Sequence, residues 1–311
     1  MTKPVELQLK DSVDLLERMA TLEPVANERS SWDCVMLSRQ QGRPGAATYI
    51  SLICDEFFEL HGDRTYGDDR AMITGIGMIG GKAVTFIGNR KGTNLRENIT
   101  CNYGMSNPEG YRKALRAARQ AEKFSRPIVC FIDTPGAYPG LGAEERGIGE
   151  AIARNLKEFA MIKVPILVFI IGEGGSGGAL GIGVGDKLYM LENAVYSVIT
   201  PEGFASILLR DPSRAKEAAQ AMKMTAKDLK RFNIIHDIIK EVPEGAHKDP
   251  SFTANIIKKT ILRDLAILCA KPPKNLVRYR IRKIRGIGDF EGTESWWNTL
   301  LEVFGRTQDL R

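Results

Sequence analysis

The sequence has few of the side chains that build metal sites or cross-linked folds. Its 311 residues include five cysteines and three histidines, and no two cysteines form a C-x-x-C pair. Structural zinc sites usually pair cysteines at that spacing, so we expect no metal in this chain. Scattered single cysteines also argue against a disulfide framework and favour a reducing compartment, so we expect a cytoplasmic location.

Long apolar runs of the kind that cross a membrane are also missing. Met1 is followed by polar and charged residues, without the apolar segment of a signal peptide. The nearest candidate span, Val164–Val184, contains Glu173 and seven glycines, which makes it a poor membrane helix. With 43% hydrophobic and 26% charged residues, the chain is expected to be globular, with no membrane association.

Acidic residues are absent from one basic segment near the C-terminus. The formal net charge is +6, and Lys271–Arg285 carries seven basic residues and no acidic one. Such a run can attract nucleic acid, phosphorylated cofactors or an acidic partner. A solvated helix face is the simpler interpretation, and no nucleic-acid-binding module is recognisable, so nucleic-acid binding is not favoured.

The chain is organised around an apolar strand that runs into a glycine cluster. Val164–Ile171 is an unbroken apolar run typical of a strand buried on both faces, and Gly172–Val184 follows it with the spacing of a packed helix. A strand, a glycine turn and a helix start present free backbone N–H groups. Those donors and the helix dipole favour an anion or a developing oxyanion.

Two other interpretations of the glycine cluster remain open. Gly172, Gly174 and Gly177 fit the G-x-G-x-x-G spacing of dinucleotide-binding turns, but Glu192 is a poor match for the acidic residue expected on the next strand. The cluster is also compatible with a tight strand–helix turn in which small residues serve packing alone.

The remaining sequence alternates strand-like and helix-like segments, which predicts an α/β fold. A β-hairpin is expected from Met72–Met78 and Ala83–Gly88. An amphipathic helix is expected to include Tyr49, Phe57 and Phe58. Further strands are predicted at 128–132, 187–191, 194–203 and 234–239, and further helices at 108–121, through 152–159, within 204–235 and at 252–268.

Several motifs occur in a fixed order and together resemble one family. The most distinctive are F-I-D-T-P-G-A-Y-P-G at 131–140 and I-G-E-G-G-S-G-G-A-L at 171–180. The others are Gly62–Arg64, Asn102–Met105, Pro108–Arg116, Ala143–Gly147, Ile152–Leu156, Tyr196–Gly203 and Gly245–Pro250. Over roughly residues 32–285 the chain is similar to the carboxyltransferase alpha subunits of bacterial acetyl-CoA carboxylase, in the crotonase superfamily.

The resemblance implies a crotonase-like ββα superhelix with N-terminal and C-terminal helical extensions. We expect a short arm or helix at 1–31, the carboxyltransferase domain at 32–250, and a C-terminal helix, basic segment and tail at 251–311. The sequence departs from the family at its ends: the N-terminal helical hairpin is shortened, and the tail with Trp296 and Trp297 has no counterpart. Thr200 stands where serine is common.

The resemblance also implies the reaction. Carboxybiotin, carried on a biotin carboxyl carrier protein, donates its carboxyl group to acetyl-CoA, giving malonyl-CoA in the first committed step of fatty-acid synthesis. A homologous beta subunit, which bears the zinc ribbon, completes the site, and an α2β2 heterotetramer is expected. A stand-alone crotonase-type acyl-CoA hydratase or isomerase is the alternative, and a non-catalytic or nucleic-acid-binding subunit ranks last.

The chemistry of carboxyl transfer suggests which residues act. Negative charge develops on the biotin ureido oxygen, and backbone N–H groups stabilise such charge without titrating. We expect the amides of Gly177 and Gly178 to hold that oxygen. Gly174, Gly175 and Ser176 are expected to bind the substrate from the same turn, and Gly136 and Ala137 are expected to form the other substrate-binding wall of the pocket.

No side-chain base is predicted, and the thioester oxygen is expected to be bound by the partner subunit. Basic residues at 90–91 and 278–285 are candidates for contact with CoA phosphates or the acidic biotinyl partner.

Overall fold

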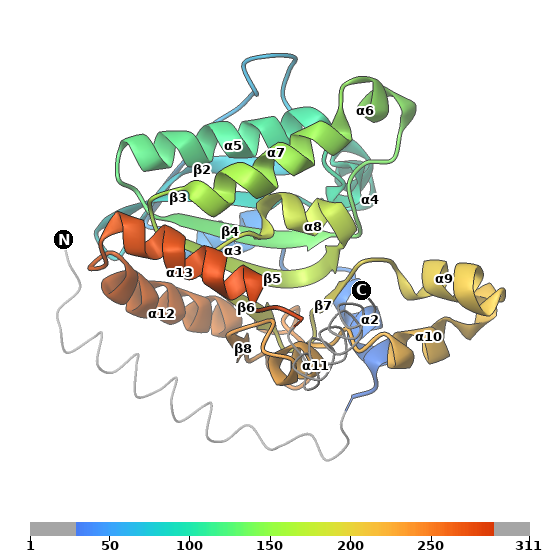
Figure 1. Cartoon of the computed structure of the whole chain (residues 1–311). Coiled ribbons are helices and arrows are strands. Elements are labelled where there is room, and N and C mark those ends of the chain that lie inside the picture. The colour runs from blue at the N-terminus through green and yellow to red at the C-terminus, as the bar shows by residue number, and fades with distance from the viewer. Residues whose placement is uncertain (1–28, 289–311) are drawn as a thin grey trace, which may run out of the picture.

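The computed structural model describes residues 29–288, which form one mixed sheet with helices on both faces (Figure 1). The strand order is β1-β2-β3-β4-β5-β6-β8, and β7 also pairs with β5. Pairing is antiparallel in the β1-β2-β3 meander and parallel from β3 through β8. The strands are β1 (Glu56–Glu59), β2 (Met72–Ile79), β3 (Lys82–Asn89), β4 (Ile128–Thr134), β5 (Ile166–Gly175), β6 (Lys187–Leu191), β7 (Val195–Ser197) and β8 (Asp237–Ile239).

Helices α5 and α7 pack together over one face of the sheet, and α8 lies between α7 and β4 (Figure 1). On the other face, α3 lies against β2, β3 and β4 and is backed by α12. The α-helices are α2 (Ser31–Ser38), α3 (Ala46–Ile53), α4 (Leu95–Thr100), α5 (Pro108–Lys123), α6 (Leu141–Glu145), α7 (Ile148–Met161), α8 (Ser176–Gly183), α9 (Pro201–Phe204), α10 (Ala215–Ala221), α11 (Ala226–Arg231), α12 (Pro250–Leu268) and α13 (Pro273–Arg285).

The central strands are held by a row of aromatic rings. Phe86, Phe131, Phe169 and Tyr189 come from four neighbouring strands, and successive ring centroids lie 5.1–6.3 Å apart. All four rings are at most 2% exposed. Aromatic contacts at this separation add to the free energy gained by burying the rings. The row therefore fixes the middle of the sheet, whose strands end in the loops that form the candidate site.

The predicted hairpin is confirmed, but the helix expected to include Phe57 and Phe58 is too long. Helix α3 ends at Ile53, and both phenylalanines belong to the edge strand β1. The opposing strand explains the difference, because a Cβ on Gly75 would lie 2.3 Å from the Phe57 ring. The glycine leaves room for that ring, a cross-strand relation that local helical spacing does not reveal.

The glycine cluster also differs from the sequence prediction in where the strand ends. Strand β5 continues through Gly175, so the glycines at 172–175 are extended and buried. The turn itself begins at Ser176, the first residue of α8. Residues 204–235 are helical but interrupted, by a π-helical turn at Ala205–Leu209 and a 3-10 turn at Pro212–Arg214.

The basic segment forms helix α13, and one of its arginines contradicts the predicted ligand contact. Arg280 is 0% exposed and pairs with Asp186 at 2.8 Å. Its guanidinium also donates to the carbonyl oxygens of Phe159, Ile162 and Val164. Arg280 therefore anchors α13 and does not face CoA or an acidic partner. The prediction was wrong because the local sequence shows the charge of this residue but not its burial.

The C-terminal helices share the core of the sheet. Ile257, Ile261 and Leu265 of α12 belong to the same buried hydrophobic cluster as the strands, as does Leu276 of α13. The domain boundaries expected at 31/32 and 250/251 stay predictions. Residues 1–28 of the arm predicted at 1–31, and the tail with Trp296 and Trp297, lie outside the described residues. Within residues 29–288, no helix combines the length and apolar character that a membrane span requires.

Candidate active site

The candidate site lies where β4 and β5 end side by side. The two strands are parallel, and Ile132 pairs with Ile170, but two residues later Thr134 pairs with Gly174. Asp133 thus stands opposite three residues of β5, which makes this register shift a bulge. Bulges commonly re-aim chain segments beside active sites. Here the bulge brings the loop after β4 level with the glycine turn after β5.

The two turns approach so closely that side chains cannot fit between them. A Cβ on Gly175 would lie 2.0 Å from the Pro135 carbonyl oxygen. A Cβ on Gly178 would lie 2.4 Å from the Gly136 carbonyl carbon and 2.7 Å from the Ala137 nitrogen. All three distances are far below van der Waals contact. The structure therefore brings Gly136 and Ala137 against Gly178, as the sequence predicted, although their roles stay a prediction.

Helix α8 begins with a sharp change of direction. Gly175 is extended, Ser176 has φ +48°, and no side chain hydrogen-bonds the helix start. A non-glycine residue in the left-handed region is uncommon and usually marks a turn or strain. Because the first-turn N–H groups lack a side-chain cap, Gly177 and Gly178 have donors available at the positive end of the helix dipole.

The remaining predicted residues differ in their surroundings. Ser176 is exposed and Gly177 is partly exposed. A Cβ on Gly177 would meet only the Ile152 side chain, at 3.4 Å, and one on Gly136 would meet nothing within 4 Å. Gly174 is packed against Tyr196, 2.9 Å from the position of a Cβ. The two turns therefore leave no room for a side chain at Gly174, Gly175 and Gly178. They do leave room for one at Gly136 and Gly177.

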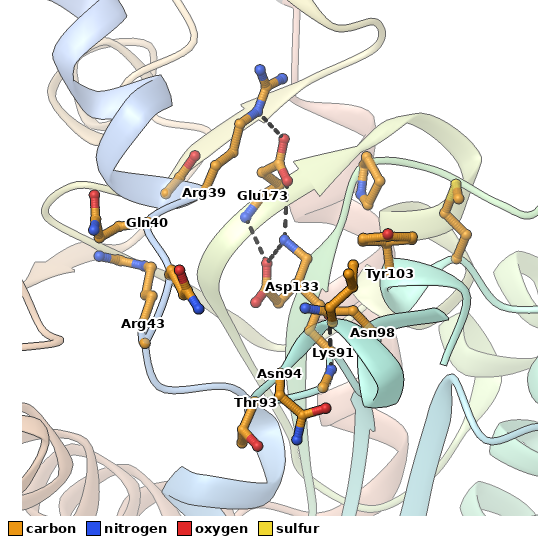
Figure 2. A pocket seen from close by; sticks show the side chains of 17 residues that line it. Arg39, Gln40, Arg43, Lys91, Thr93, Asn94, Asn98, Tyr103, Asp133 and Glu173 are labelled. Carbon is orange, nitrogen blue, oxygen red and sulfur yellow. Dashed lines mark hydrogen bonds and ion pairs between the residues drawn. The ribbon is translucent and has the colours of Figure 1, made fainter. Parts of the chain in front are cut away.

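A cluster of charged side chains gathers around Asp133 and Glu173, near the ends of β4 and β5 (Figure 2). The Lys91 ammonium pairs with Asp133 at 2.7 Å and with Glu173 at 3.0 Å. Arg39 holds the other Glu173 oxygen at 2.6 Å and also pairs with Glu202. The Glu173 backbone N–H donates to the Asp133 carboxylate at 3.0 Å. We call Arg39, Lys91, Asp133 and Glu173 the subturn cluster.

Two largely buried members of the subturn cluster, Lys91 and Glu173, have pKa values that favour their charged forms. Burial alone lowers the pKa of Lys91, but attraction to Asp133 and Glu173 outweighs it, so the pKa of Lys91 is raised. Burial likewise raises the pKa of Glu173, but Lys91 and Arg39 outweigh it and leave that pKa below its usual range. Asp133 and Glu173 are 3% and 8% exposed. Both carboxylates lie within ion-pair distance of the Lys91 ammonium.

An open cavity of about 630 Å³ adjoins the cluster and reaches the first residue of the loop after β4. Its walls come from the α2–α3 connection, the loop after β3 and the ends of β4 and β5 (Figure 2). Polar and charged side chains predominate, among them Arg39, Gln40, Lys91, Asn94, Asn98 and Glu173. Tyr103 also lines it and has φ +54°, a conformation that is rare for a bulky residue.

Sequence reasoning missed the subturn cluster. Lys91 was considered as a contact for CoA phosphates, but its ammonium is held by two carboxylates and its side chain is only 20% exposed. Asp133 lay inside a quoted motif without a role. The usable signal was a charged residue inside an otherwise apolar strand, which a buried strand tolerates only with a partner. Within residues 29–288, no group of three or more metal-binding side chains is found.

Comparisons with known proteins agree with the resemblance seen in the sequence. The family model described as acetyl co-enzyme A carboxylase carboxyltransferase-like matches residues 1–288, a longer span than the motifs alone indicated. The chain is 59% identical over 289 residues to the acetyl-coenzyme A carboxylase carboxyl transferase subunit alpha of Treponema denticola, covering 92% of this chain and 95% of the relative. It is 50% identical over 288 residues to the Listeria monocytogenes subunit of the same name, covering 92% and 91%.

Solved structures support the crotonase-like fold. A transcarboxylase 12S structure matches with a TM-score of 0.59 and 18% identity, over 80% of this chain and 50% of that one. A subunit of a Pseudomonas malonate decarboxylase hetero-tetramer matches with a TM-score of 0.58 and 16% identity, over 76% and 92%. The chain thus spans about half of the transcarboxylase chain and nearly all of the decarboxylase one.

Proposed function

The chain belongs to the family of acetyl-CoA carboxylase carboxyltransferase alpha subunits, and from that premise we propose how its glycine turns act. Members of this family are transferases. The reaction moves the carboxyl group of carboxybiotin to acetyl-CoA, which yields malonyl-CoA. We propose that this chain provides the half of the site that binds the biotin ureido group, and that a beta subunit provides the half that binds the thioester.

One observation supports this role above the others. Gly178 lies so close to Gly136 and Ala137 that no Cβ fits, yet the turn carrying Ser176 and Gly177 is open to solvent. We propose that backbone N–H groups from the two turns face one accessible spot beside Gly177. That arrangement suits an oxygen that gains negative charge during the reaction, and it suits the small ureido oxygen of biotin.

The donors can be assigned from the hydrogen bonds already made. The Gly136 N–H donates to the Thr134 hydroxyl at 3.1 Å, so it is already engaged. We therefore assign the Ala137 N–H as the donor from the loop after β4, facing the amides of Gly177 and Gly178. When carboxybiotin is bound, it supplies an activated carboxyl group and a ureido oxygen that becomes more negative as that group leaves.

The chain's own residues would orient the ureido ring and stabilise its oxygen. Backbone donors need no proton of their own to be lost, so this half of the site works without a titrating side chain. The dipole of α8 adds to the stabilisation near its N-terminus. We assign Gly174 and Gly175 to the close approach of the turns, and Ser176 to the accessible edge of the biotin site.

Exposed apolar side chains around the turns support a site completed by another chain. Leu141, Leu180 and Val198 are 76%, 42% and 78% exposed, and each is close in sequence or strand pairing to a turn residue. Apolar surface of this kind commonly marks a protein interface. We propose that the beta subunit packs on this apolar surface and that the two subunits form an α2β2 assembly. A biotin carboxyl carrier protein would deliver carboxybiotin to it. The five free cysteines support a reducing, cytoplasmic setting.

The test is the reverse reaction, malonyl-CoA-dependent carboxylation of free biotin. It is measured with the full chain alone, with its purified beta partner alone and with the two mixed. Activity only in the mixture supports the shared site. Activity of this chain alone would mean that it holds both oxyanion sites, as a stand-alone crotonase-type enzyme does. No activity in a complex shown to assemble would contradict the proposed function.

A further inference from the structure

The distance between the two turns depends on contacts other than the backbone hydrogen bonds between β4 and β5. Regular pairing between β4 and β5 stops at Ile132 and resumes at Thr134. Between those points, the Asp133 carboxylate accepts the Glu173 N–H at 3.0 Å. A Cβ on Gly172 would lie 2.4 Å from that carboxylate. A side chain thus replaces the missing ladder bonds within the bulge.

Lys91 links the two strands at this bulge. Its ammonium lies 2.7 Å from Asp133 and 3.0 Å from Glu173. Lys91 is itself confined by Gly104, where a Cβ would lie 3.2 Å from the lysine Cγ and 2.5 Å from the Asp133 carbonyl oxygen. Among residues 29–288, Glu173 also has Arg39 as a cation, whereas the ion pair recorded for Asp133 is with Lys91 alone.

Each carboxylate lies close to the end of its strand, shortly before one turn. Asp133 is the next-to-last residue of β4, and Glu173 is followed in β5 only by Gly174 and Gly175. The backbones of those turns are already in closest contact at Gly175 and Pro135. A small change in the bulge would therefore displace Ala137 relative to Gly178, and misplacing a catalytic group by about 1 Å costs about 10²-fold in rate.

We propose that Lys91 is a positioning residue that holds the two glycine turns in register by bridging Asp133 and Glu173. The proposal rests on the proposed function of those turns. Without the ammonium, two largely buried carboxylates would face each other with one cation fewer. Like charges in that setting repel, so one carboxylate takes up a proton or the strand ends separate.

The test uses the assembled complex of the full chain with its beta partner, assayed by carboxylation of free biotin. Lys91→Met is expected to lower kcat about 10- to 100-fold, because both donor turns move. The KM for malonyl-CoA is expected to stay within about twofold, because the partner binds that substrate. Lys91→Arg is expected to recover part of the loss, because it keeps the charge.

A matched control is Lys113 of helix α5, which is 1% exposed and pairs with Asp68 at 2.6 Å. Lys113→Met removes a buried charge away from the turns. It is expected to lower the thermal midpoint while leaving kcat per folded complex within about twofold of wild type. If the Lys91→Met loss is no larger than this after correction for folded complex, the positioning role is wrong.

A double variant separates positioning from direct ligand contact. Asp133→Asn removes the charge that Lys91 neutralises but keeps an oxygen that accepts the Glu173 N–H. Lys91→Met with Asp133→Asn is therefore expected to recover about tenfold in kcat over Lys91→Met alone. No recovery would mean that the ammonium acts on the ligand itself and would overturn the proposal. An inactive wild-type complex would instead overturn the proposed function.

Discussion

Strand β5 is held at both ends by a positively charged side chain, and the two ends differ in what that charge does. At its N-terminal end, Arg280 is 0% exposed, pairs with Asp186 and donates to three carbonyl oxygens. At its C-terminal end, Lys91 is 20% exposed and lies at the wall of a cavity. The first cation is buried within the fold, whereas the second lies beside the turns that we propose bind biotin.

The contrast indicates how to separate stability from function in this protein. A buried ion pair is costly to break because the remaining charge has no partner or solvent. Breaking the pair at Arg280 should therefore affect folding, and changes near Lys91 should affect the reaction first. The variants below test this division, starting with the largest expected effect.

Arg280→Met should destabilise the fold without changing the chemistry. Asp186 would remain at 0% side-chain exposure without its cation, and a broken buried pair costs about 3–5 kcal/mol of unfolding free energy. Denaturant unfolding measures the loss, with the exposed Arg278→Met as the control on the same helix. An unfolding free energy equal to that of wild type would show that the Arg280 pair contributes nothing to the fold.

Gly178→Ala should damage the reaction more than the fold. The new Cβ would lie 2.4 Å from the Gly136 carbonyl carbon, so the two turns must move apart. The proposed N–H donors could then no longer bind the same oxygen. Losing one oxyanion donor costs about 10²–10³ in kcat, and a loss of that size is expected in biotin carboxylation. Wild-type kcat in a folded complex would place the ureido oxygen elsewhere.

Gly177→Ala is the neighbouring control, and its effect should be smaller. A Cβ at position 177 would meet only the flexible Ile152 side chain, at 3.4 Å. The N–H donor is kept, so kcat should fall less than about tenfold. Measuring kcat of both alanine variants in one assay checks this. Equal losses of kcat would show that a side chain at position 177 collides with the bound ligand rather than with the protein.

Charge reversal on the exposed face of α13 should have the smallest effect. Arg278 and Arg282 are exposed on the helix that Arg280 anchors at the opposite end of β5 from the turns. Arg278→Glu with Arg282→Glu is expected to leave both KM values within about twofold, as is usual for surface sites. A clear rise in the KM for malonyl-CoA would restore the hypothesis that this helix binds CoA phosphates.

Sequence reasoning identified the parts of the site that depend on short-range pattern. The apolar strands, the glycine turn and the family motifs all lie within windows of about ten residues. It therefore predicted that Gly136 and Ala137 oppose Gly178. It could not distinguish Gly177 from Gly178, because the difference lies in which atoms of 136–137 and 152 face each one.

The charged residues were harder to interpret for the same reason. Lys91 and Arg280 were assigned together as candidate ligand contacts because both are basic. Their partners, Asp133, Glu173 and Asp186, lie 42 or more residues away in the chain. A residue's charge is visible in the sequence, but its burial is a property of the tertiary fold. The strand at Phe57 was missed because the opposing strand was not considered: Phe57 pairs there with Gly77, and its ring occupies the space that a side chain at Gly75 would need.

The close approach of the turns also determines which of their positions can vary during evolution. The donors belong to the backbone, so a substitution changes the space around them but not their chemistry. Gly175 and Gly178 face other backbone atoms, and selection for the fold alone keeps them small. Gly136 faces open space, so only the bound ligand limits its size. Relatives that lost biotin chemistry would therefore keep glycine at 175 and 178 but drift at 136.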